Sequence, residues 1–165
     1  MKKSIFVALA VAAVCLTSCG FGKSATTNTS SSASTAVTTN GNQMGRSTGV
    51  ALDNLATQYK ADGKLDMTNL MNIANMLNVI GGAQNVYENK SDKEYLGSFS
   101  KGLVAGSLNI DTDEAAEGIT EQLESLAEQT NLNELQSAMQ KGQATATEVQ
   151  NVANSVTNII SLFKK

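Results

Sequence analysis

The chain of 165 residues contains no histidine, no tryptophan and no proline, and it has two cysteines. Without histidine it has no Ser-His-Asp or Cys-His catalytic group and no histidine-ligated zinc site. The missing tryptophan and the 4% of aromatic residues argue against stacking on sugars or nucleobases. The missing proline is typical of a chain of helices that end at glycine or asparagine.

Acidic residues outnumber basic ones in the second part of the chain. Residues 48–165 contain fifteen Asp and Glu against eight Lys, which gives a net charge of −7. Polyanions bind proteins through Lys and Arg, so the sequence predicts no nucleic-acid partner. The same charge predicts that an anionic membrane surface repels this domain.

The first twenty residues have the pattern of a secretory signal. Lys2 and Lys3 precede an apolar run from Ile5 to Leu16, and small residues follow before Cys19. The apolar run is too short to cross a bilayer core of about 30 Å, which needs about 20 residues. The pattern therefore predicts a signal that is cleaved.

The segment Leu16-Thr17-Ser18-Cys19 resembles the lipobox of bacterial lipoproteins, and the resemblance covers residues 1–20. It implies that residues 1–18 are removed, that the Cys19 thiol carries a diacylglycerol and that the new amino terminus is acylated. Several acyl chains hold a protein firmly on a membrane. The resemblance implies the bacterial cell envelope. Because Gly20 is not the aspartate that retains lipoproteins at the inner membrane, it favours the periplasmic face of the outer membrane in a Gram-negative host.

The rest of the chain divides into a tether and a helical domain. Residues 19–46 are rich in Ser, Thr, Asn, Ala and Gly, which predicts a disordered tether after the lipidated cysteine. Residues 47–165 predict an all-α bundle. The expected helices cover residues 48–61, 67–88, 92–108, 112–129, 132–141 and 146–163.

Capping signals mark most of these helix starts. A small polar residue stands three residues before Glu at Ser91, Asp111, Asn131 and Thr145, which is the pattern of a capping box. Asp66, just after Gly63, is a fifth expected N-cap.

A weak internal repeat relates the two ends of the domain, about residues 52–80 and 132–159. Thr68-Asn69-Leu70-Met71-Asn72-Ile73-Ala74-Asn75 aligns with Thr147-Glu148-Val149-Gln150-Asn151-Val152-Ala153-Asn154. The apolar positions step by three and four residues in both segments, and Leu77 aligns with Val156. A duplicated helix–loop–helix unit predicts that both of these side chains are buried. Chance similarity of two Asn-rich amphipathic helices is the alternative.

Two stripes at helical spacing are candidate interaction sites. The first consists of Glu114, Glu117, Glu121, Glu124 and Glu128. Like charges at this spacing oppose a helix slightly, so the stripe is either a solvated face or a surface for a basic partner. The second consists of Ser98, Gly102 and Gly106. Small residues at a spacing of four permit close helix approach, either inside the fold or at a homodimer seam.

No residue pattern indicates catalysis, so the sequence predicts a protein that is not an enzyme. Two loops match a calcium-binding loop only in part, because Lys60 and Glu114 occupy unsuitable positions. We therefore expect no metal and no cofactor. The composition favours a structural or protein-interaction module on a membrane anchor. The alternative is a carrier of small molecules or lipids, with a cavity lined by the methionines of the second helix. Neither reading fixes the oligomeric state.

Overall fold

The computed structural model describes residues 31–163, and the side chains of residues 38–163. Every regular element in this range is an α-helix, which confirms the predicted all-α bundle of about six helices. The helices are α1 (Ser31–Asp62), α2 (Leu70–Glu88), α3 (Lys93–Gly106), α4 (Asp113–Gln129), α5 (Leu132–Gln140) and α6 (Ala146–Ser161). The signal sequence and Cys19 lie outside the described residues.

The last two helices begin at the predicted caps. The Asn131 side chain accepts a hydrogen bond from the backbone N–H of Glu134 at the start of α5. At the start of α6, Glu148 Oε2 accepts from the backbone N–H of Thr145 at 2.8 Å, and Thr145 Oγ1 accepts from the Glu148 N–H at 3.3 Å. This capping box also lowers the pKa of Glu148, because the Thr145 hydroxyl and N–H both donate to its carboxylate.

The three earlier caps are displaced from their predicted positions. Asp92 and Thr112 cap α3 and α4, each one residue after the predicted cap. The Asp66 carboxylate accepts from the Thr68 N–H and hydroxyl at 2.9 and 2.7 Å, so it closes a local turn instead of capping a helix. Asn69 caps α2 by accepting from the Met71 N–H at 2.9 Å.

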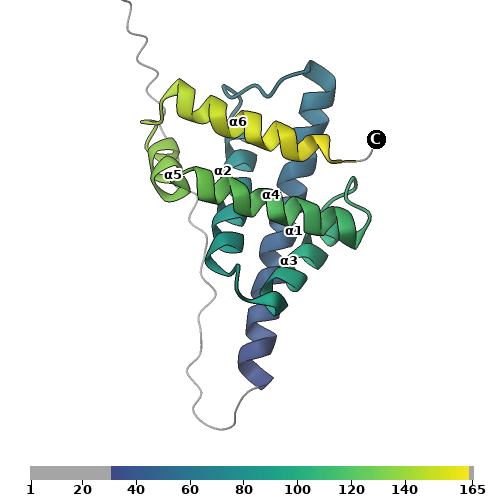
Figure 1. The fold of residues 1–165 in the computed structure, drawn as a ribbon. Helices are drawn as coiled ribbons and strands as arrows, with labels where there is room; N and C mark the ends of the chain where they lie inside the picture. Colours follow the sequence, from purple (N-terminus) through teal and green to yellow (C-terminus); the bar gives the residue numbers. More distant parts are fainter. Residues whose placement is uncertain (1–30, 164–165) are drawn as a thin grey trace, which may run out of the picture.

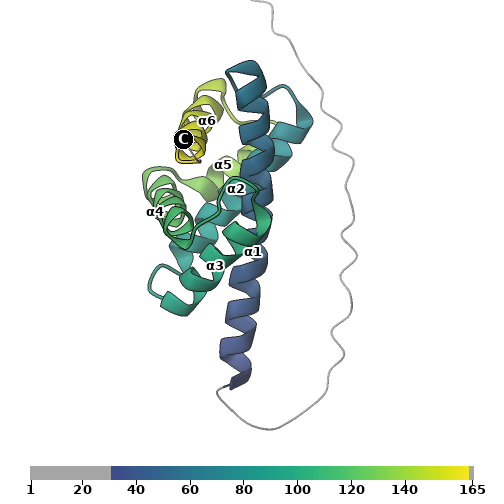
Figure 2. The ribbon, with the colours of Figure 1, turned by 90° about the vertical axis from the view of Figure 1, so that its right-hand side faces the viewer.

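The long helix α1 forms one side of the bundle. Figures 1 and 2 show α1 beside α2 and α3, with α4 and α6 lying across its direction and its first turns projecting beyond the loop between α2 and α3. Contacts join α1 to α2, α3 and α6, and α4 packs against α2, α3 and α6. All six helices contribute apolar side chains to one buried core, which includes Leu52, Met76, Phe99, Leu123 and Val156.

The backbones of α1 and α3 are in direct contact. Gly41, Gly45 and Gly49 lie on the face of α1 that meets α3, and a Cβ on Gly49 would come within 2.7 Å of the Leu103 carbonyl oxygen. On the other side, a Cβ on Gly102 or Gly106 would overlap a carbonyl group of α1. Both helices therefore need small residues every four positions, as the spacing allows.

This contact explains why the folded part begins earlier than the sequence predicted. Residues 31–46 belong to α1, whereas the sequence placed them in the tether and started the domain at residue 47. The segment has low helix propensity and almost no apolar periodicity. Its glycines pack on α3, so tertiary contact overrides the local preference.

The two segments of the proposed repeat do not pack in equivalent ways. Val156 is fully buried, whereas Leu77 is only half-buried. Asn72 and Asn75 are buried, and their counterparts Asn151 and Asn154 are exposed. The reason is that α2 contacts α1, α4 and α5, so its buried face differs from that of α6. The expectation of equivalent burial is wrong for Leu77.

The glycine contact can be tested with two alanine substitutions. A Cβ on Gly45 would overlap the Phe99 carbonyl group, so we expect Gly45→Ala to destabilise the fold by about 1–3 kcal/mol, as overpacking does. Gly81 in α2 has no atom near its Cβ position, so Gly81→Ala should stabilise the fold by up to about 1 kcal/mol. Urea unfolding measures both changes. Equal shifts of the two midpoints would contradict the close packing of α1 on α3.

The asymmetry between α2 and α6 gives a second prediction. The buried Asn72 side chain donates to the Asp66 carbonyl at 2.6 Å, and Asn151 is exposed. Both positions gain the same helix propensity on substitution by alanine, so the difference between them reports the buried bond. We expect Asn72→Ala to be less stable than Asn151→Ala by about 1–2 kcal/mol in thermal or urea unfolding. If the two variants unfold together, Asn72 makes no contribution that depends on burial.

Candidate functional site

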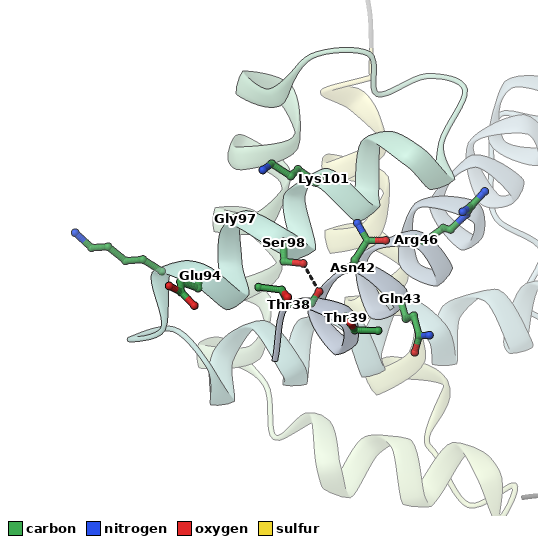
Figure 3. Close-up of a pocket in the computed structure, with 10 residues that line it drawn as sticks. Thr38, Thr39, Asn42, Gln43, Arg46, Glu94, Gly97, Ser98 and Lys101 are labelled. Atoms are coloured by element: carbon green, nitrogen blue, oxygen red, sulfur yellow. Dashed lines mark hydrogen bonds between the residues drawn. The ribbon is translucent and has the colours of Figure 1, made fainter. Parts of the chain in front are cut away.

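A groove of about 870 Å³ follows the N-terminal half of α1 along α3. Both helices contribute polar side chains to it, as Figure 3 shows. The described lining residues are Thr38, Thr39, Asn42, Gln43, Arg46, Lys93, Glu94, Gly97, Ser98 and Lys101. The groove exists because the small residues between the helices leave no side chains to fill the seam, and longer side chains stand on both sides.

The groove differs in charge from the rest of the domain. Residues 38–163 contain seven basic and fifteen acidic residues, a net charge of −8. Three of the seven basic residues line the groove, and Glu94 is its one described acidic lining residue. The groove is therefore a locally basic surface on an acidic domain, which the average charge of the sequence conceals.

The basic groups are spread along the groove. Lys93 and Lys101 are eight residues apart on α3, which is about 12 Å along a helix axis. Figure 3 shows the Arg46 and Lys101 side chains pointing in different directions from the helix seam. All three basic side chains are exposed. This arrangement suits contact with several separate negative charges better than enclosure of one small anion.

A hydrogen bond joins the two walls of the groove. The Ser98 hydroxyl donates to the Thr38 carbonyl oxygen across the seam. Ser98 is thus part of the small-residue stripe and also part of the groove lining. The stripe of Ser98, Gly102 and Gly106 lies against α1 of the same chain, which occupies the face that a homodimer seam would need.

The acidic stripe on α4 lies close to the groove between α1 and α3. Glu114, Glu117, Glu121 and Glu128 are exposed, and Glu124 is half-buried. The Lys90 ammonium lies 3.0 Å from Glu128 Oε1 and 4.2 Å from the centre of the Tyr87 ring. The hydrogen bond to Glu128 raises the pKa of Lys90. Glu117 and Glu121 also share a small surface pocket of about 270 Å³ with Lys93.

The carrier hypothesis placed the methionines of the second helix around a cavity. Met76 is completely buried in the core, and Met71 is 66% exposed on the surface. A second pocket, of about 450 Å³, lies where α1 meets the C-terminal end of α2 and is lined mainly by amide and hydroxyl side chains. Both the groove and this pocket are lined mainly by residues with polar side chains.

Two further findings concern residues 31–163. None of the described helices combines the length and the hydropathy needed to cross a membrane. Within the same range, no group of three or more Asp, Glu or Cys side chains is placed to hold a metal ion.

Sequence reasoning missed the groove because it assigned half of it to the tether. One signal was available. Gly41, Gly45 and Gly49 repeat every four residues, the same spacing as Ser98, Gly102 and Gly106. Two matching small-residue stripes predict a helix pair, and that pair would have extended the first helix to Gly41.

The acidic stripe yields a prediction about stability. Replacing Glu117, Glu121 and Glu124 by Gln removes repulsion between like charges and keeps the Glu128–Lys90 pair, so the fold should persist with a slightly raised melting temperature. Glu128→Gln is the matched comparison and should not raise the melting temperature, because it removes the partner of Lys90. Circular dichroism at low and high salt measures both. A triple variant that melts much earlier would show that the stripe makes structural contacts.

Comparison of the chain with known families, with curated proteins and with solved structures finds no match. The fold class therefore rests on the six described helices and their packing. The groove and the N-terminal sequence are the features that bear on function.

Proposed function

We propose that the protein is a lipid-anchored protein of the bacterial envelope whose helical domain serves as an interaction module. The observation that carries the proposal is the groove between α1 and α3, where three of the seven basic residues of an acidic domain gather. Amide and hydroxyl side chains beside them supply further hydrogen-bonding groups. Such a surface is suited to recognising a partner that carries negative charge.

The anchor is inferred from the N-terminal sequence. Leu16-Thr17-Ser18 before Cys19 supports lipidation of that cysteine, and Gly20 favours the outer membrane with the domain on the periplasmic face. Eleven residues separate Cys19 from Ser31, the first residue of α1. The domain would thus follow its anchor after a shorter segment than the sequence alone indicated.

An interaction module accounts for the described surface better than a carrier does. A carrier of small molecules or lipids needs an enclosed site that is mainly apolar. The groove is open and lined mainly by residues with polar side chains, and Met76 lies in the core with no exposed surface. The acidic stripe on α4 offers a second surface, for a partner with basic groups.

Lipidation is tested with a palmitate analogue in bacteria that express the full chain. We expect the wild-type protein to take up the label and to fractionate with membranes. Cys19→Ala should abolish both, because the thiol that forms the thioether is lost. Cys15→Ala is the matched control, since Cys15 lies in the predicted signal and its variant should still be labelled. Label that persists in Cys19→Ala would refute the anchor.

A further inference from the structure

The basic and acidic residues of the domain are unevenly distributed among its helices. Residues 38–50 and 88–106, which form the α1–α3 region and the loop before it, contain four basic and three acidic residues. The other residues between 51 and 163 contain three basic and twelve acidic ones. The domain therefore has one weakly basic region. Most of its acidic residues belong to other segments, and Glu117 and Glu121 of α4 border the region beside Lys93.

The basic region lies at the end of α1 that is nearer to the predicted anchor. Thr38 is seven residues from the start of α1, about 10 Å along its axis, whereas Asp62 is 31 residues from the start, about 47 Å away. In Figures 1 and 2 the two ends of α1 lie at opposite ends of the molecule. The twelve Cα–Cα steps from Cys19 to Ser31 span at most about 43 Å, whatever the conformation.

From these two observations we infer that the α1–α3 groove contacts the anionic headgroups of the membrane that holds the anchor. Arg46, Lys93 and Lys101 face the headgroup phosphates, and the Asp62 end of α1 is directed away from the membrane. The inference rests on the proposed lipid anchor, because it uses the position of Cys19 relative to α1.

The anchor and the groove have different roles in this arrangement. A free domain with a net charge of −8 is repelled by an anionic surface, as the sequence predicted. A lipid on Cys19 removes the cost of bringing the domain to the surface and holds the groove at a high effective concentration there. Each Lys or Arg close to an anionic membrane then contributes about 1 kcal/mol, which is enough to select one orientation.

The test uses the mature chain, residues 19–165, in which Cys19 is the one cysteine. Cys19 is coupled to a maleimide lipid in vesicles of phosphatidylcholine, with or without phosphatidylglycerol. Lysine acetylation is then followed by mass spectrometry. On the anionic vesicles we expect Lys93 and Lys101 to react about fivefold more slowly than on neutral ones, the factor that 1 kcal/mol gives. Lys64 and Lys141 should react equally on both.

Two variants with equal loss of charge separate the groove from general electrostatics. Arg46→Gln with Lys101→Gln should remove the protection of Lys93, and Lys64→Gln with Lys141→Gln should leave it unchanged. Circular dichroism should show that both double variants are folded. Protection should also disappear at about 1 M salt, where screening acts within about 3 Å.

Three outcomes would overturn the inference. They are equal acetylation of all lysines on both vesicles, equal protection on neutral and anionic vesicles, and the same protection by free glycerol phosphate without vesicles. An acidic protein that protects Lys93 while the anionic vesicles do not would assign the groove to a protein partner instead. Because chemical coupling supplies the anchor, none of these results depends on lipidation in the cell, which the Cys19→Ala experiment tests separately.

Discussion

The structure depends on the close approach of α1 to α3. Glycines every four residues on α1 meet Ser98, Gly102 and Gly106 on α3, so that the backbones touch and any Cβ at Gly45 or Gly102 would overlap the opposite helix. A segment rich in Ser, Thr and Asn has a low intrinsic helix propensity. Backbone packing and the apolar core that begins at Ala51 stabilise this segment as a helix, since dispersion contacts accumulate over the whole seam.

The same contact produces the groove. Where two helices meet through glycines, their longer side chains stand at the borders of the seam and leave an open channel between them. At this seam those side chains are Arg46 from α1 and Lys93 and Lys101 from α3. The surface chemistry is therefore a consequence of the packing: a larger residue at Gly45 or Gly102 would push the helices apart and change the groove together with the fold.

The sequence predicted the class of the fold and much of its local structure. All six helices were expected, and the caps at Asn131 and Thr145 were found. The caps of α2, α3 and α4 lie one to three residues after their predicted positions. The sequence-based prediction was wrong where contacts between distant segments determine the structure. Residues 31–46 needed the matching stripe on α3, and the burial of Asn72 needed the position of Asp66 and the helices around α2. The acidic stripe was found, but its partner Lys90 lies 38 residues before Glu128 and comes close only in the folded chain.

The net charge of the domain does not reveal the locally basic groove. A net charge of −8 over residues 38–163 predicts repulsion from any anionic partner. This prediction holds when the domain and the partner are far apart compared with the dimensions of the domain. At contact distance the potential depends on the nearest groups, which at the groove are three cations and Glu94. A freely diffusing domain is repelled by its net charge before it can reach contact distance. A domain held at a surface by a lipid is already at contact distance, so the local arrangement of charges decides which face it presents. In the proposed arrangement, the predicted anchor and the groove are parts of one site, joined by α1.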